Sequence, residues 1–316
     1  MRLRAASLVL LVASSIGLAQ DGEPLLQPGR RVIFLGDSIT NAGHFVAMVE
    51  ARLRTSSPQS RFDIINLGLP SETVSGLSEP DHPFPRPNLH ERLDRVLAKA
   101  RPDLVVACYG VNDGIYYPFS EERFSAYKKG IGKLIDKVRE AKARLILMTP
   151  PPFDPLPMRK QGKLRQAGSE KFAWFAIYAS YDEEVMAKYA AWILQQRERV
   201  LEVVDLRTPI LAHVRKRRET SPDFALSGDG IHLNAAGHRI IAGALLDAAN
   251  IATTKPSPKL EKLVERRMGI LRDAWLSHVG HKRPGIRKGP SIEAAATMLA
   301  GIDSEIAGSH AARNEP

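Results

Sequence analysis

Short, almost entirely apolar runs alternate with longer helical patterns along most of this chain, and this alternation constrains its fold more than any other feature. The apolar runs are rich in Val, Ile and Leu and cover residues 31–35, 62–66, 104–108, 145–148 and 200–206. Helical periodicity lies between them over residues 44–54, 89–100, 120–141 and 170–199, and follows them over residues 235–248. Strands without a polar face are covered by helices on both sides, as in parallel sheets. The pattern therefore predicts a three-layer α/β domain, which we assign to residues 28–250.

The expected sheet is doubly wound and parallel, with about five strands in the flavodoxin-like order 2-1-3-4-5. Two long connections, residues 70–88 and 149–175, follow predicted strands at their carboxyl ends. Open α/β sheets bind ligands at that edge, and connections of this length in a compact domain are usually functional or disordered. We therefore expect both connections to line a substrate cleft.

The two ends of the chain differ from this central domain. Arg2 and Arg4 precede an apolar, Ser-rich stretch, and the small residues Gly17 and Ala19 fit a cleavage site. This pattern predicts a signal peptide over residues 1–19 and an exported protein, periplasmic or extracellular, with an uncleaved anchor as the alternative. Residues 256–316 contain an apolar helical stripe, a break rich in Gly, Pro and Lys, and a last helical pattern. We interpret them as a C-terminal helical extension docked on the domain, with partner binding as the alternative.

The formal net charge of +10 raises the question of an acidic polymer as partner. The densest basic run, residues 215–218, follows an apolar stretch and is typical of a solvated helix end. Basic and aromatic residues do not alternate as they do in nucleic-acid-binding modules. We therefore expect no nucleic-acid partner and, after signal cleavage, no stable membrane insertion. The oligomeric state does not follow from the sequence, and Cys108, the single cysteine, excludes an intramolecular disulfide.

Polar motifs lie where the predicted strands end. Ser38 in GDSIT follows the first strand, Gly68 in NLGLPSET follows the second, and Asn112 in YGVNDG follows the third. In the expected strand order, Gly68 and Asn112 flank Ser38 at one edge of the sheet. A further motif, DGIH, places Asp229 three residues before His232 at the start of the last helix.

Each motif alone has a structural explanation, because Asp and Ser cap helices while Gly and Asn favour turns. Together they contain the parts of a serine hydrolase. A nucleophilic serine needs an imidazole base, and the base needs a carboxylate to orient it, which the Asp229-x-x-His232 spacing supplies within one turn. The N–H groups of Ser38 and Gly68 and the amide of Asn112 can bind the oxyanion. The sequence therefore predicts a serine esterase that needs no metal and no organic cofactor.

These motifs resemble those of the SGNH hydrolases, also called GDSL-type esterases and lipases. GDSIT resembles the block that carries the nucleophile, NLG the second block, GVND the third and DGIH the last, and the resemblance covers residues 31–250. It implies Ser38 as nucleophile, Gly68 and Asn112 as oxyanion donors, and His232 with Asp229 as the base pair. Ser71 departs from the pattern, because many members carry a second glycine there, and this departure bears on the shape of the second loop.

The resemblance implies an ester substrate without naming it, because the family includes lipases, thioesterases, arylesterases and carbohydrate deacetylases. This chain has no broad apolar lid helix, and both long connections are rich in Pro and in charged residues. We therefore expect a short acyl group, such as acetyl, on a small molecule or glycan, with a carbohydrate ester as the first candidate. A lipase, an arylesterase and an acyltransferase are alternatives. A non-catalytic glycan-binding protein and a metal-dependent phosphoesterase are further ones.

Three further residues are candidates for substrate contacts. Asp37 precedes the nucleophile and is expected mainly to support the turn at Ser38. His44 lies close to the GDSIT motif, and Trp174 lies in the second long connection. His238 is expected to pack within the last helix and not to act as a second base.

Overall fold

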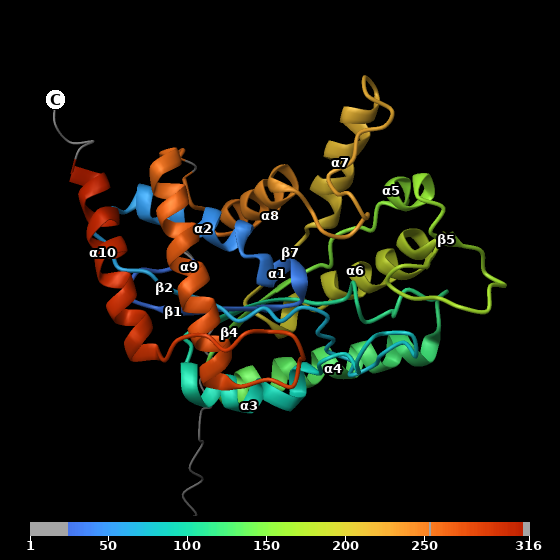
Figure 1. Cartoon of the computed structure of the whole chain (residues 1–316), viewed down its shortest axis with the longest axis horizontal. Coiled ribbons are helices and arrows are strands. Elements are labelled where there is room, and N and C mark those ends of the chain that lie inside the picture. Colours follow the sequence, from blue (N-terminus) through green and yellow to red (C-terminus); the bar gives the residue numbers. More distant parts are fainter. Residues whose placement is uncertain (1–24, 253, 312–316) are drawn as a thin grey trace, which may run out of the picture.

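The computed structural model describes residues 25–252 and 254–311, with a central parallel sheet flanked by helices (Figure 1). The sheet has five strands in the order β2-β1-β3-β4-β7. Its strands are β1 (Arg31–Gly36), β2 (Asp63–Asn66), β3 (Leu104–Cys108), β4 (Arg144–Met148) and β7 (Glu202–Val204). All pairings between them are parallel. This is the predicted 2-1-3-4-5 order, so the α/β fold class expected from the sequence is confirmed.

Helices cover both faces of the sheet because its strands are apolar on both (Figure 1). On one face lie α1 (Ser38–Ala42), α2 (His44–Ser56), α7 (Arg207–Arg218) and α8 (Ala235–Ala248). On the other lie α3 (Leu89–Ala100), α4 (Glu121–Glu140) and α6 (Ala187–Leu194). In the described part of the chain, no helix is both long and apolar enough to cross a membrane.

The helix predicted over residues 170–199 is wrong in its first half. Residues 177–178 form strand β6 (Ile177–Tyr178), which pairs with β5 (Leu164–Arg165), and helical structure begins only with a π-helical turn at Tyr181–Met186. The backbone N–H of Tyr178 donates to the carbonyl of Tyr116. A helix over these residues would need that donor internally, so the tertiary pairing prevents it. A 3-10 turn, Arg197–Arg199, ends the segment.

The C-terminal extension forms two long helices, α9 (Pro258–Val279) and α10 (Ile292–Ala311), which pack against each other. Helix α9 also packs on α2, α3 and β2, so it covers the β2 edge of the sheet (Figure 1). Its stripe of Leu260, Val264 and Met268 is buried in the same core cluster as the strands. The extension is therefore continuous with the core of the α/β domain. Residues 1–19, predicted as a signal peptide, lie outside the described residues, as do the last five residues of the extension.

The two long connections contribute to the carboxyl edge of the sheet in different ways. The connection over residues 70–88 is irregular but tied down, since the carboxylate of Asp113 accepts hydrogen bonds from the N–H groups of Val74 and Ser75, at 2.9 and 2.8 Å. The second connection contains a short helix, α5 (Pro155–Lys160), and strand β5. The N–H of Asp154, before α5, donates to the carbonyl of Gly230. The first connection therefore contacts the loop that follows β3, and the second contacts the loop that carries Asp229 and His232.

Candidate active site

Ser38 is the first residue of α1, directly after β1. The side chain of Asp37 caps this helix, because its Oδ1 accepts a hydrogen bond from the N–H of Ile39 at 2.9 Å. A Cβ atom at Gly36 would lie 2.2 Å from Thr40 Oγ1 and 2.8 Å from the carbonyl oxygen of Cys108. Only glycine fits before the capping residue, so the sharp turn that presents Ser38 depends on the GDS sequence.

His232 and Asp229 lie next to Ser38 although they are almost 200 residues away in sequence. His232 Nε2 is 2.8 Å from Ser38 Oγ, and His232 Nδ1 is 2.6 Å from Asp229 Oδ2. Asp229 Oδ1 accepts hydrogen bonds from the N–H groups of Ile231 and His232, at 2.9 and 2.8 Å. The loop therefore folds around this carboxylate, which holds both the backbone and the ring of His232.

Glycine is required in this loop at position 230. Gly230 has a φ of 78°, and a Cβ atom there would lie 2.2 Å from the carbonyl oxygen of Asp154. Both the left-handed conformation and the close approach favour glycine. Asn234 then caps α8 through hydrogen bonds from Ala236 and Gly237, so the loop ends on a rigid helix.

The electrostatics of this pair favour a charged imidazole. The hydrogen bond that His232 donates to Asp229 raises the pKa of His232, and this effect and the nearby negative charges outweigh the opposing effect of burial. Burial alone would raise the pKa of Asp229, but its hydrogen bonds to the side chain and backbone of His232 hold that pKa well below its usual range. Asp229 therefore stays ionised and stabilises His232 when the imidazole takes up a proton.

Asn112 follows β3 and is only 4% exposed. Its Nδ2 donates to the carbonyl oxygen of Glu72 at 3.2 Å, and its Oδ1 accepts a hydrogen bond from the hydroxyl of Tyr116 at 2.7 Å. These two contacts orient the amide. Because an amide nitrogen carries two hydrogens, one donor of Asn112 remains for a substrate.

Gly68 does not have the free N–H that we expected from the sequence. Its N–H donates to Asn66 Oδ1 at 2.9 Å, and a Cβ atom there would lie 2.4 Å from the backbone nitrogen of Asn41. Glycine at this position thus allows the second loop to approach the end of α1, and its N–H is already occupied.

Ser71 offers a donor that the sequence reasoning missed. It is partly exposed and has a φ of 67°, in the left-handed region that non-glycine residues rarely adopt. Its N–H has no hydrogen-bond acceptor among the described residues, and it directly precedes Glu72, whose carbonyl holds Asn112. The sequence signal was the glycine that many members carry at this place, because glycine there reports a backbone with positive φ.

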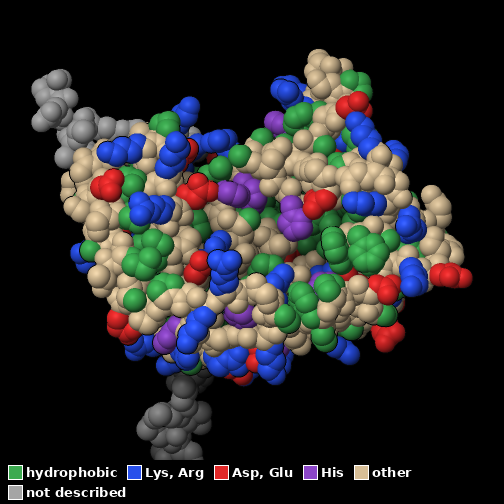
Figure 2. All heavy atoms as spheres, viewed as in Figure 1, with side chains coloured by type: hydrophobic (Ala, Val, Ile, Leu, Met, Phe, Trp, Pro, Cys, Tyr) green, Lys and Arg blue, Asp and Glu red, His purple; other side chains and the backbone are tan. Residues whose placement is uncertain are grey.

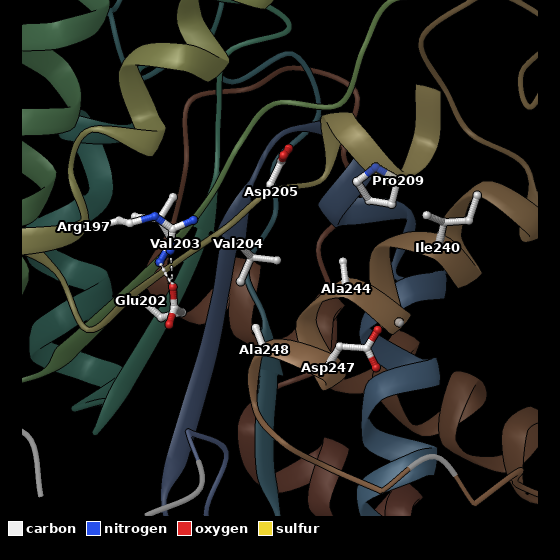
Figure 3. A pocket seen from close by; sticks show the side chains of 11 residues that line it. Arg197, Glu202, Val203, Val204, Asp205, Pro209, Ile240, Ala244, Asp247 and Ala248 are labelled. Carbon is white, nitrogen blue, oxygen red and sulfur yellow. Dashed lines mark hydrogen bonds and ion pairs between the residues drawn. The ribbon is translucent and has the colours of Figure 1, made fainter. Parts of the chain in front are cut away.

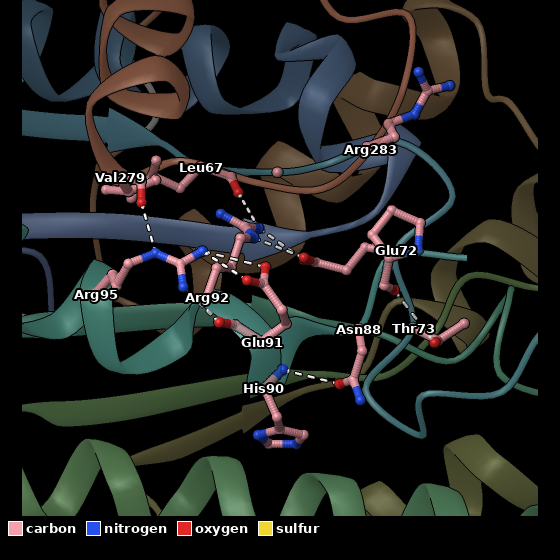
Figure 4. A network of polar contacts seen from close by, with 12 residues as sticks. Leu67, Glu72, Thr73, Asn88, His90, Glu91, Arg92, Arg95, Val279 and Arg283 are labelled. Atoms are coloured by element: carbon pink, nitrogen blue, oxygen red, sulfur yellow. Dashed lines mark hydrogen bonds and ion pairs between the residues drawn. The ribbon is translucent and has the colours of Figure 1, made fainter. Parts of the chain in front are cut away.

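A buried ion pair between Glu72 and Arg92 fixes the loop that carries Gly68 and Ser71. Arg92 of α3 donates to both carboxylate oxygens of Glu72, at 2.6 and 2.7 Å, and to the carbonyl oxygen of Leu67 at 2.7 Å (Figure 4). Tyr109 donates its hydroxyl proton to the same carboxylate at 2.7 Å. Burial raises the pKa of Glu72 against the opposing effect of Arg92. Residues 67–72 are thereby fixed to the sheet and to α3.

The other candidate contacts differ in exposure. Asp37 is 4% exposed and caps α1, which is the supporting position expected from the sequence. Burial raises the pKa of Asp37 to about 7, against hydrogen bonding by Ile39 and the charge of His232. Trp174 is 49% exposed and lies with Phe175 at the tip of a turn closed by hydrogen bonds between Ala173 and Ala176.

His44 is half-exposed, and its Nδ1 lies 2.7 Å from Glu265 Oε1. Its ring packs edge-to-face on His238, with the ring centres 5.1 Å apart. His238 is 2% exposed, and burial together with the nearby charges of His44 and His232 lowers its pKa to about 4. His238 is therefore a neutral packing residue between the other two histidines.

A second hollow of the described residues lies apart from Ser38 and His232. A hollow of about 590 Å³ between β7 and α8 has Val203, Val204 and Asp247 among its lining residues, and neither Ser38 nor His232 lines it (Figure 3). Among the residues that the structure describes, no group of three or more His, Cys, Asp and Glu side chains could hold a metal ion.

Comparisons with known proteins place the chain in a family. The model of the GDSL-like lipase/acylhydrolase family matches residues 34–240, which is more than half of the chain. The chain therefore belongs to this family and is a serine ester hydrolase.

The solved structures that share its fold include two enzymes. One is a variant of Axe2, an acetyl-xylooligosaccharide esterase from Geobacillus stearothermophilus, at 23% identity and a TM-score of 0.53, covering 73% of this chain and 99% of that chain. The other is a gut microbial diltiazem-metabolizing enzyme, at 20% identity and a TM-score of 0.57, covering 73% of this chain and 48% of that chain. This chain thus spans about half the length of the second enzyme. No curated protein matches the chain.

Proposed function

We propose that this ester hydrolase removes a short acyl group, such as acetyl, from a carbohydrate, with Ser38 as nucleophile, His232 as base and Asp229 as the residue that orients the base. The observation that carries the proposal is the unbroken pair of hydrogen bonds from Ser38 Oγ to His232 Nε2, at 2.8 Å, and from His232 Nδ1 to Asp229, at 2.6 Å. This arrangement matches the geometry that activates a serine hydroxyl for acyl transfer.

In the first step, His232 Nε2 takes the proton of Ser38 as Oγ attacks the ester carbonyl carbon. The tetrahedral intermediate carries its negative charge on the former carbonyl oxygen, and Asp229 stabilises the imidazolium that forms. His232 then donates its proton to the leaving alcohol, and an acyl group remains on Ser38. Water enters by the same route in reverse, with His232 again as base, and releases the acid.

The oxyanion needs preorganised donors at the carboxyl edge of the sheet. We assign this role to the N–H of Ser38 and the second amide hydrogen of Asn112. The N–H of Ser71 replaces that of Gly68 as the third donor, because Gly68 donates to Asn66 while the N–H of Ser71 has no acceptor in the described part of the chain. Glu72, which follows Ser71, forms an ion pair with Arg92 and accepts a hydrogen bond from Asn112 through its carbonyl oxygen. These contacts hold the donors of Ser71 and Asn112 in a fixed relative position.

Two observations support a carbohydrate ester. Axe2, which shares the fold, is an acetyl-xylooligosaccharide esterase. In this chain Trp174 and Phe175 are 49% and 43% exposed, with ring planes 89° apart and centres 5.3 Å apart. Exposed aromatic rings on a turn held by backbone hydrogen bonds offer flat apolar surfaces to the apolar faces of sugar rings.

The proposal is tested with the purified enzyme on a panel of esters. Acetylated xylo-oligosaccharides, p-nitrophenyl acetate and p-nitrophenyl palmitate are compared for kcat/KM, with Ser38→Ala as the inactive variant and Ser60→Ala as the matched control. We expect the acetyl esters to be preferred and the Ser38→Ala variant to lose activity on all of them. A preference for the palmitate ester would contradict the short acyl group, and transfer of acetate to an added alcohol in place of water would identify an acyltransferase.

We also propose export of the mature protein, supported by the Arg2, Arg4 and apolar pattern of residues 1–19. Expression of the full chain in a bacterial host, followed by fractionation and N-terminal sequencing, tests this. Mature protein outside the cytoplasm that starts at residue 20 is expected. Full-length protein retained in the cytoplasm would contradict export, and full-length protein in the membrane fraction would show an uncleaved anchor.

A further inference from the structure

The C-terminal extension, which lies beyond the family match at residues 34–240, reaches the surroundings of Ser38. Glu265 of α9 contacts His44, the first residue of α2, at 2.7 Å. About two turns before the end of α9, Arg272 donates to the carbonyl oxygen of Asn41 in α1 at 2.8 Å. Helix α9 therefore contacts both α1, which begins with Ser38, and α2, which follows it.

The contact with Glu265 determines what His44 can offer to a ligand. Because His44 Nδ1 faces a carboxylate, the hydrogen of a neutral imidazole resides on Nδ1, and Nε2 carries a lone pair. His44 Nε2 has no hydrogen-bond partner among the described residues, and the side chain is 47% exposed. In its neutral form, His44 therefore presents Nε2 to solvent as a hydrogen-bond acceptor.

His44 packs on α8, the helix that follows the loop carrying His232. His238 of α8 packs edge-to-face on His44, with ring centres 5.1 Å apart, and α2 and α8 pack against each other. Figure 2 shows histidine side chains with acidic neighbours near the centre of the face on which α9 lies. The side chains of both histidine–carboxylate pairs are about half-exposed and therefore open to a ligand from solvent. The exposed fractions are 47% and 52% for His44 and Glu265, and 54% and 45% for His232 and Asp229.

We propose that His44, oriented by Glu265 of the C-terminal extension, accepts a hydrogen bond from a hydroxyl group on the alcohol part of the ester and thereby selects substrates derived from polyols. The proposal rests on the proposed function and specifies how the same site recognises its substrate. His44 is the specificity-determining residue, and Glu265 is a positioning residue that acts through it. A hydroxyl is the matching group, because an imidazole lone pair accepts from an O–H donor and gains nothing from an alkyl chain.

The test compares acetate esters that differ only in the hydroxyl groups of the alcohol. Glycerol monoacetate and acetylated xylobiose are paired with propyl acetate, and kcat/KM is measured for the wild type, His44→Ala, Glu265→Ala, Glu265→Gln and the double alanine variant. Asp303→Ala is the matched control, because Asp303 is a carboxylate of the extension with 48% exposure that also forms an ion pair at 2.7 Å, with Arg267.

We expect His44→Ala and Glu265→Ala to lower kcat/KM for the two hydroxyl-bearing esters by about tenfold, the value of one hydrogen bond, and to leave propyl acetate within about twofold. Glu265→Gln, whose amide oxygen still accepts from Nδ1–H, should keep most of the activity. The double variant should be no worse than His44→Ala alone, because Glu265 acts only through His44.

Other outcomes overturn the proposal. Equal losses on all three esters would show that the pair is structural, and unchanged kinetics would show that it does not contact substrate. A wild type that hydrolyses propyl acetate as well as the hydroxyl-bearing esters would also refute it, while leaving the acetyl esterase assignment intact. A wild type inactive on every acetate ester would instead refute the proposed function together with this inference.

Discussion

Replacing Asp37 by Asn should make the protein more stable at alkaline pH, and the gain should shrink as the pH falls. Asp37 is 4% exposed, and burial raises its pKa from 3.8 to about 7. The folded state thus binds the proton more tightly than the unfolded state. The stability contributed by Asp37 is therefore fully present below pH 3.8 and is lost as the pH rises toward 7. Asparagine keeps the acceptor oxygen that caps α1, so the cap should survive the substitution.

The size of the effect follows from the pKa difference. One pH unit corresponds to about 1.4 kcal/mol when the folded state binds one more proton than the unfolded state. Between pH 5 and pH 8 the wild type should lose about 2.6 kcal/mol relative to Asp37→Asn, with most of the loss below the folded pKa of about 7. Above pH 8 the difference should be constant.

The measurement is urea unfolding of both proteins at pH 5, 6, 7 and 8, with the free energy of unfolding extrapolated to water. The account expects the Asp37→Asn curve to rise relative to the wild type across this range. A difference that does not change with pH, or that favours the wild type more at pH 8 than at pH 5, would refute the reasoning, because it would mean that Asp37 is ionised without cost beneath Ser38.

Three further predictions concern activity. Asp229 raises the pKa of His232 above 6.5, and the base must be neutral to act, so kcat/KM should fall as the pH drops through that raised pKa. A kcat/KM that is flat from pH 5 to 9 would contradict the assignment of His232 as base. Ser71→Gly should keep activity and raise stability by about 0.5–1 kcal/mol in thermal unfolding, because the φ of 67° suits glycine, and a loss of stability would argue against strain there. Gly230→Ala should lower kcat/KM by about 100-fold or more, because the new Cβ atom would lie 2.2 Å from the carbonyl oxygen of Asp154 and displace the loop that carries His232. Near-normal kinetics would show that this loop tolerates the shift.

The strand order could be predicted because alternating strands and helices favour a doubly wound sheet, and most strand bounds because buried strands are apolar runs; the fifth strand, predicted over residues 200–206, spans only Glu202–Val204. The run Leu104–Cys108 has the predicted bounds, since a buried strand of a parallel sheet needs consecutive apolar residues. The positions of Ser38, Asn112 and His232 near one edge follow from that order. Their short hydrogen-bond distances could not be predicted, because they depend on the conformation of the loop around Asp229.

Features that depend on distant residues could not be predicted from local patterns. The segment before Tyr181 has helical periodicity but donates its backbone hydrogen bonds to other loops, as Tyr178 does to Tyr116. The pairing of Glu265 with His44 joins residues 221 positions apart. Neither residue carries a local signal for this contact, and the same holds for the buried pair of Glu72 and Arg92.

The most direct test of the account is covalent labelling of the wild type with a fluorophosphonate probe, followed by peptide mass spectrometry. An activated serine reacts with this probe, whereas an ordinary serine hydroxyl does not. The account predicts one label per chain, located on Ser38, and loss of labelling in His232→Ala, because the 2.8 Å contact between Ser38 Oγ and His232 Nε2 activates the hydroxyl. Labelling of a different residue, or of Ser38 at an unchanged rate without His232, would contradict the account.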